Sequence, residues 1–85
     1  MIVRITHVTV VGRSRLELRF NDGVIKTVDL ESLLEGPIFE PLREADYFSM
    51  VQLNPECGTV TWPNGADFAP EALYELDAVE QDQVI

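Results

Sequence analysis

The clearest pattern in the chain is the strict alternation of charged and hydrophobic residues between positions 15 and 20. In an extended chain Leu16, Leu18 and Phe20 fall on one side and the charged residues on the other. The pattern predicts a β-strand with one face in the core and one in water. Residues 2–11 are rich in Ile, Val and Thr and predict a preceding strand that ends at Gly12.

A tight turn is expected to join the alternating strand to a third one. Asn21-Asp22-Gly23 is typical of a hairpin, because glycine adopts the positive φ angle that closes such a turn. A three-residue loop places Val24 and Val28 on the core face and lets Lys26 extend its ammonium group toward water. A two-residue loop would set Glu17 opposite Val28. The hydrophobic pattern therefore favours the three-residue loop.

Two short helical segments are expected after this hairpin. Asp29 caps the first, and Gly36-Pro37 ends it, because glycine allows a left-handed turn and proline cannot continue a helix. Pro41 starts the second, which runs to Asp46, since proline costs nothing at a first helical position. The side chains expected to reach the core from these segments are Leu30, Leu33, Leu34, Phe39, Leu42 and Phe48.

The rest of the chain predicts a second hairpin and a last helix. Residues 50–54 and 59–62 flank Asn54-Pro55-Glu56-Cys57-Gly58, a run typical of a turn. The chain turns again at Pro63-Asn64-Gly65 and begins a helix at Pro70. Hairpins with interspersed helices predict an α+β fold, with a small, mostly antiparallel sheet built from hairpins and two or three short helices.

Length and composition indicate one folded domain. Eighty-five residues bury only about 60 to 65% of their unfolded surface, too little for two separate cores. Residues 1–76 are expected to form this single α+β domain, and residues 77–85 an acidic, mobile tail, since the tail has few apolar side chains. The single cysteine, Cys57, favours a reducing cytoplasm. Without a signal-peptide pattern or an apolar run of about 20 residues, no membrane association is expected.

The net charge of −9 is unevenly distributed. Residues 1–28 carry five basic residues against two acids, a net +3, whereas residues 29–85 carry one against thirteen, a net −12. An acidic surface repels phosphate backbones, so this chain alone should not bind nucleic acid. It would suit a basic protein partner, or solubility alone. The cluster of Arg13, Arg15 and Arg19 is expected to pair with the protein's own acidic half, within one subunit or between subunits.

The residue pattern supports no catalytic, metal or cofactor site. His7 is the only histidine, so neither a Ser-His-Asp triad nor a two-histidine metal site can be assembled within one chain. Glu31 with Glu35, and Glu71 with Glu75, lie one helical turn apart, but nothing nearby completes a coordination sphere. The glycines fall at turns and do not form a phosphate-binding loop. The pattern therefore favours a protein that is not an enzyme and has no cofactor.

The best candidate for an interaction surface is the corner formed by Trp62, Asn64, Asp67 and Tyr74. The Asp67 carboxylate either contacts a partner or accepts backbone N–H groups and fixes the turn, and the structural role is favoured. Trp62 alternates with Val60, which places its ring in the core with its indole N–H bonded locally. A ligand pocket or small active site beside Trp62 and Asp67 is the alternative, and it requires Tyr74 and His7 to line the same pocket.

Several short motifs follow one another along the chain: Leu18-Arg19-Phe20-Asn21-Asp22-Gly23, Val28-Asp29-Leu30, Gly36-Pro37-Ile38-Phe39 with Leu42, the Phe48 region, and Trp62-Pro63-Asn64-Gly65-Ala66-Asp67 before Pro70-Glu71 and Leu73-Tyr74. In their order and spacing they resemble the small bacterial family catalogued as domain of unknown function 2442. The resemblance covers nearly all of the chain up to about Tyr74.

This resemblance implies a compact α+β domain with no assigned enzymatic activity. Similar proteins are often encoded beside a short protein of another family, which suggests a toxin–antitoxin-like pair with this domain in the antitoxin position. Some relatives carry a helix-turn-helix DNA-binding domain after this one, and the present sequence ends before such a domain. We therefore expect a non-catalytic interaction module, the antitoxin-like partner of a small basic protein, with a homodimer as a further alternative.

Overall fold

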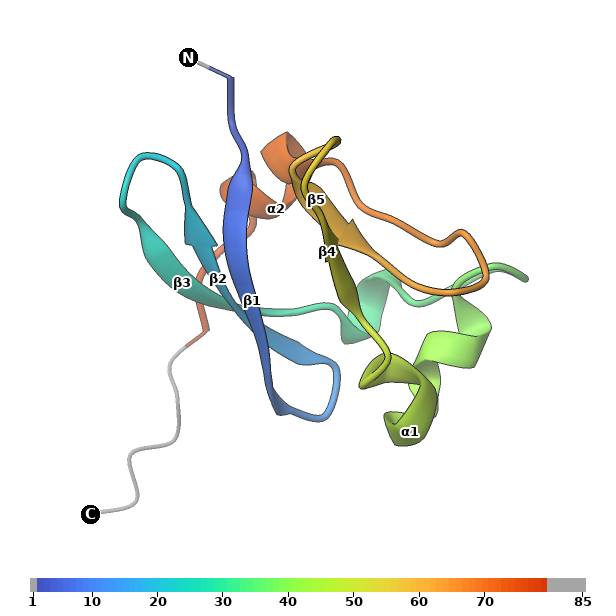
Figure 1. Ribbon diagram of the computed structural model, residues 1–85. Coiled ribbons are helices and arrows are strands. Elements are labelled where there is room, and N and C mark those ends of the chain that lie inside the picture. The colour runs from blue at the N-terminus through green and yellow to red at the C-terminus, as the bar shows by residue number, and fades with distance from the viewer. Residues whose placement is uncertain (1, 80–85) are drawn as a thin grey trace.

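Three antiparallel strands form the larger of two sheets in the computed structural model, which describes residues 2–79 (Figure 1). The strands are β1 (Ile5–Gly12), β2 (Arg15–Phe20) and β3 (Ile25–Asp29), in the order β1-β2-β3. Leu16, Leu18 and Phe20 are buried on one face of β2, as their alternation predicts.

The β2–β3 hairpin has the predicted three-residue loop. The Phe20 N–H donates to the Val24 carbonyl at 2.8 Å, and Leu16 lies opposite Val28. Lys26 lies opposite Leu18 and is only partly exposed, so its stem covers the core face as expected. The expectation that its ammonium group extends toward water was wrong, because the ammonium group binds backbone carbonyls at the end of the last helix. The expectation that Val24 is buried was wrong. Val24 is 39% exposed, because it lies at the end of the β2–β3 turn, where its carbonyl closes the loop with the Phe20 N–H.

The chain between the sheets forms three short helical segments: η1 (Glu31–Leu33), η2 (Glu40–Arg43) and α1 (Ala45–Phe48). The Asp29 carboxylate accepts the Glu31 N–H at 2.9 Å, and Leu30 and Leu34 are fully buried. Leu33, expected in the core, is 40% exposed, because η1 is a single 3₁₀ turn that the chain leaves at Leu34. The helix expected from Pro41 to Asp46 is divided in two, since Glu44 is extended.

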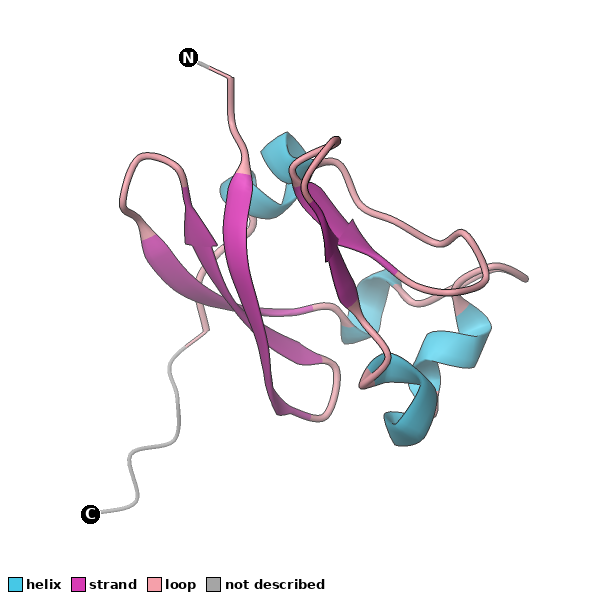
Figure 2. Ribbon diagram, viewed as in Figure 1, coloured by secondary structure: helices cyan, strands magenta, loops and turns pink. Residues whose placement is uncertain are grey.

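A second hairpin and a last helix complete the described chain. Strands β4 (Gln52–Asn54) and β5 (Thr59–Thr61) form the two-stranded sheet, and α2 spans Pro70–Glu75. The Ile5 N–H donates to the Gly58 carbonyl at 2.7 Å and joins β1 to this hairpin. Figure 2 shows η1, η2 and α1 grouped on one side of the molecule and α2 apart from them. This arrangement confirms the predicted α+β fold.

The segment after α2 runs back to the larger sheet. The Lys26 ammonium group donates to the carbonyl oxygens of Tyr74 and Leu76 at 2.7 and 2.5 Å. The Val79 N–H then donates to the Thr27 carbonyl at 2.8 Å. Of the tail predicted over residues 77–85, positions 80–85 lie outside the described residues. Within residues 2–79 no helix is long and apolar enough to span a membrane.

Candidate functional site

Trp62 is a core residue, as its alternation with Val60 predicts. It is only 3% exposed, and its indole N–H donates to the Phe48 carbonyl at 3.0 Å. The rings of Trp62 and Phe48 lie 5.7 Å apart, centroid to centroid. Trp62 therefore fixes β5 to α1 and does not present its ring to a partner.

Asn64 stabilises the turn that follows Trp62. Its side-chain oxygen accepts the Ala66 N–H at 3.0 Å, and its side-chain amide donates to the Ile38 carbonyl at 2.8 Å. These two bonds close the turn and connect it to the loop before η2. Stacking of the Phe39 and Phe68 rings, with centroids 5.0 Å apart, strengthens the same junction.

Asp67 does not have the capping role expected of it. Its backbone bridges to Thr61, whereas its carboxylate is exposed and makes no hydrogen bond to any of residues 2–79. The N-cap of α2 is Ala69, which offers no capping side chain. The expectation was wrong because Asn64 binds the turn's N–H group and because Asp67, paired through its backbone, lies two residues before the N-cap.

Tyr74 anchors α2 to the β2–β3 hairpin. Its hydroxyl donates to the Asp22 carboxylate at 2.5 Å, and its ring packs edge-on against Phe20 at 4.9 Å. The Lys26 ammonium group lies 5.7 Å from the ring centroid. The Tyr74 hydroxyl and, to a lesser extent, the Val24 N–H lower the pKa of Asp22, and the Asp22 carboxylate raises the pKa of Tyr74.

The four corner residues thus have separate partners: Trp62 contacts α1, Asn64 the loop before η2, and Tyr74 the first hairpin, while the Asp67 side chain is exposed. None of them lines either of the two hollows beside the β1–β2 turn.

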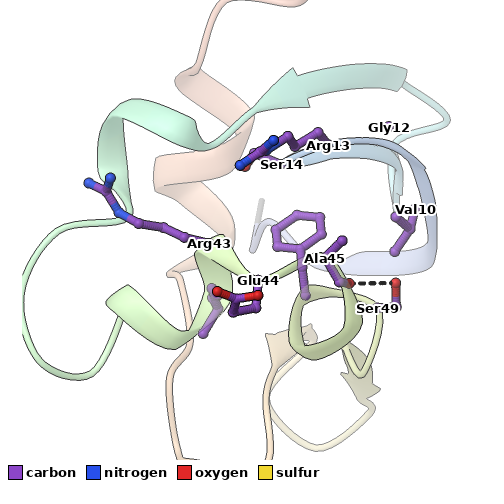
Figure 3. A pocket seen from close by; sticks show the side chains of 10 residues that line it. Val10, Gly12, Arg13, Ser14, Arg43, Glu44, Ala45 and Ser49 are labelled. Atoms are coloured by element: carbon purple, nitrogen blue, oxygen red, sulfur yellow. Dashed lines mark hydrogen bonds between the residues drawn. The ribbon is translucent and has the colours of Figure 1, made fainter.

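The larger hollow lies between the β1–β2 turn and the segment from η2 to α1 (Figure 3). It has a volume of about 460 Å³, within the range typical of small-molecule sites. Its lining residues are Val10, Gly12, Arg13, Ser14, Leu42, Arg43, Glu44, Ala45, Phe48 and Ser49. The hollow brings together two segments about thirty positions apart in the sequence, which is why the residue pattern did not reveal it.

Ser14 has an unusual backbone in the wall of this hollow. Gly12 pairs with Arg15, so Arg13 and Ser14 form a two-residue turn. Ser14 has φ 58°, and among residues 2–79 it is the one residue other than glycine with a positive φ. Its carbonyl accepts the Leu30 N–H at 2.7 Å, which holds this conformation in place. Such strain is often found at functional positions. One indication of this strain was visible in the sequence: the two-residue turn Arg13-Ser14 contains no glycine to adopt a positive φ.

The arginines in this part of the molecule differ in whether their side chains form bonds to other residues. Arg15 forms a salt bridge with Asp29 at 3.4 Å, which confirms the expected pairing with the acidic half for this residue. The Arg43 Nε donates to the Leu34 carbonyl at 2.7 Å. Arg13 and Arg19 are exposed, and neither side chain forms a hydrogen bond or ion pair with the described residues.

A smaller hollow of about 290 Å³ lies beside the same turn and is lined by Val11, Gly12, Arg13, Arg15, Asp29 and Glu31. His7 lines neither hollow. Its Nδ1 lies 3.1 Å from the Thr6 hydroxyl, so this exposed strand histidine is satisfied by its neighbour, as expected. Across residues 2–79, no group of three histidine, cysteine or acidic side chains is arranged to hold a metal ion.

Comparison with known proteins gives one match. The model of the family described as "Protein of unknown function (DUF2442)" matches residues 5–78, most of the chain. No curated protein and no solved structure matches the chain significantly.

Proposed function

The chain belongs to the DUF2442 family of proteins of unknown function, and we propose that this member is a non-catalytic module that binds another protein. The observation that carries the proposal is a set of acidic side chains that have no partner. They are Glu31, Glu35, Glu40, Glu44, Asp46, Glu56, Asp67, Glu71, Glu75 and Asp77. All ten are exposed, and none forms an ion pair with another residue between 2 and 79.

Unpaired carboxylates of one sign repel one another, and a basic partner would relieve that repulsion. It would also be steered toward the acidic half by long-range attraction, which raises association rates. These arguments support a small basic protein as the partner. The antitoxin-like role follows from the family resemblance and is the more specific form of the same proposal.

The acidic residues from Asp67 to Asp77 are the part of this surface that we assign to the contact. Glu71 and Glu75 lie on α2, and Asp67 and Asp77 lie on either side of it. The Tyr74 hydroxyl and the Lys26 ammonium group fasten α2 to the β2–β3 hairpin. A surface fixed in this way loses little conformational freedom on binding. Asp67 adds an exposed carboxylate that has no structural partner among the described residues.

Affinity purification from the native host tests the proposal. The wild-type chain should recover a small basic protein, and binding should weaken as salt rises, because surface charges are screened. The triple variant Glu71→Gln, Glu75→Gln, Asp77→Asn should lose this partner. Recovery of no basic protein would contradict the proposal.

A matched variant distinguishes a specific contact at α2 from a general electrostatic attraction to the acidic half. The variant Glu40→Gln, Glu44→Gln, Asp46→Asn also removes three negative charges, but from the segment that runs from η2 to α1. It should keep the partner. If both triple variants bind equally well, the acidic half serves solubility alone, and if both lose the partner equally, the contact is not located at α2.

The same proposal includes a cytoplasmic location, a homodimer as a further alternative, and a single domain over residues 1–76. The exposed, unpaired thiol of Cys57 is consistent with a reducing cytoplasm. Mass measurement in solution distinguishes a monomer from a homodimer. A chain truncated after residue 76 should fold if residues 1–76 form the whole domain, although Val79 bonds to Thr27.

A further inference from the structure

We propose that the larger hollow binds a small organic carboxylate, with its apolar body against Val10 and Ala45 and its carboxylate at Arg13. This site is independent of the proposed protein-binding surface on α2.

The hollow has an apolar floor that is already organised. Leu42 is fully buried and Phe48 is 2% exposed, so both side chains are held by the core behind them. The Phe48 carbonyl is bonded to the Trp62 indole, which fixes the backbone under the hollow. Leu42 and Phe48 therefore close the hollow from behind, and the apolar surface that a ligand can bury belongs to the more exposed Val10 and Ala45.

Arg13 supplies the charge that the floor lacks. Its side chain reaches from the β1–β2 turn along the hollow toward the side where Arg43 lies (Figure 3). Because Arg13 has no bonding partner among the described residues, all of its N–H groups are available to a ligand. The planar guanidinium matches a carboxylate with two parallel hydrogen bonds. Arg43 also belongs to the lining, but its Nε is held by the Leu34 carbonyl and its guanidinium points away from Ala45 and Ser49 (Figure 3).

Glu44 sets the charge of the ligand. It lines the same hollow, so the three charged side chains there sum to a single positive charge. A carboxylate balances that charge, whereas a phosphate monoester would bring up to two negative charges close to Glu44. The wall also lacks the run of glycine N–H groups that cradles phosphates. The site therefore favours a monoanion.

The strained turn supports the same assignment. Ser14 is 6% exposed and lines the hollow, and the Leu30 N–H fastens its carbonyl. Arg13 is the adjacent residue of this two-residue turn. The strained turn therefore fixes the backbone from which the Arg13 side chain extends, a use that such strain serves in binding sites.

An NMR titration of the full-length chain tests the proposal with 4-phenylbutyrate as the probe and the uncharged 4-phenylbutanamide as its comparison. We expect 4-phenylbutyrate to bind in the low millimolar range, as is usual for a ligand of about 12 heavy atoms, and to shift the amide signals of Ser14, Ala45 and Ser49. The amide should bind about tenfold more weakly, because it lacks the charged pairing with Arg13.

Two pairs of variants locate the site. Arg13→Gln should weaken 4-phenylbutyrate binding about tenfold, and Arg19→Gln, which removes an exposed arginine outside both hollows, should leave binding unchanged. Ala45→Leu fills the hollow and should abolish binding, whereas Ala72→Leu on the exposed side of α2 should not. Each variant's amide spectrum shows whether it is folded.

Three results would overturn the proposal: no binding of 4-phenylbutyrate to the folded wild-type chain at about 10 mM, equal affinity for the acid and the amide, or equal effects of Arg13→Gln and Arg19→Gln.

Discussion

The hydroxyl of Tyr74 on α2 donates a hydrogen bond of 2.5 Å to the carboxylate of Asp22 in the β2–β3 turn. The two residues are 52 positions apart in the sequence, so the bond joins the last described helix to the N-terminal part of the chain. Lys26 acts beside it, since its ammonium group binds the carbonyls at the end of α2. A helix of six residues is too short to be stable alone, and these side chains fasten it to the sheet.

The Tyr74–Asp22 bond should make stability depend on pH at both ends of the range. Asp22 has a lowered pKa in the folded protein, so its contribution is present above about pH 4 and is lost as pH falls through the lowered value. Tyr74 has a raised pKa, so its contribution is present below about pH 10 and is lost as pH rises through the raised value. Urea unfolding across this range should show Tyr74→Phe less stable than the wild type at neutral pH.

That difference between wild type and Tyr74→Phe should shrink toward acid and toward alkali. The control is Asp22→Asn, which keeps an oxygen acceptor for the Val24 N–H but removes the charge. In this variant the pKa of Tyr74 should return toward its ordinary value in a phenolate titration. An unchanged Tyr74 pKa in Asp22→Asn would show that the bond does not form in solution.

Lys26→Met should destabilise the fold by about 2 kcal/mol, because it keeps most of the apolar stem but leaves the Tyr74 and Leu76 carbonyls without their charged donor. Arg19→Met removes the same charge from an exposed position with no bonding partner among the described residues, and should change stability by less than about 0.5 kcal/mol. Urea unfolding compares the two. Equal losses would mean that net charge, and not the bond to α2, is responsible.

Several elements could be predicted from the sequence because they depend on a strict period. The alternation of Leu16, Leu18 and Phe20 fixes which face of β2 is buried, and a register slip of one residue would expose all three. The same reasoning places Trp62 in the core beside Val60. Short non-periodic segments were less predictable, since a single 3₁₀ turn does not determine whether Leu33 or its neighbour faces inward.

The site could not be predicted, because its parts are distant in the sequence. Arg13 belongs to the β1–β2 turn and Glu44 to the junction between η2 and α1, and these two segments meet only in the folded chain. Asn64 and Asp67 both carry a side-chain oxygen, so either could accept the backbone N–H groups of their turn. The geometry of the folded turn decides between them: the Asn64 side chain accepts the Ala66 N–H, and the Asp67 backbone bridges to Thr61.

Asn64→Ala should therefore cost about 1 to 2 kcal/mol, since it removes the acceptor for the Ala66 N–H and the donor to the Ile38 carbonyl. Asp67→Ala, three residues away in the same corner, should cost less than about 0.5 kcal/mol because its carboxylate has no partner in the described chain. Thermal or urea unfolding of the two variants measures the contrast. A larger loss for Asp67→Ala would restore the capping role to that residue.

Ser14→Gly should raise stability by up to about 1 kcal/mol, because glycine adopts a φ of 58° without the steric cost that serine bears. The gain is partly offset by the greater freedom of glycine in the unfolded chain. Ser14→Ala is the matched control: it keeps the strain and should remain close to the wild type in urea unfolding. If the turn is strained to position Arg13, Ser14→Gly should also bind 4-phenylbutyrate more weakly while being more stable. A variant that is both less stable and equal in binding would show that the Ser14 conformation carries neither strain nor function.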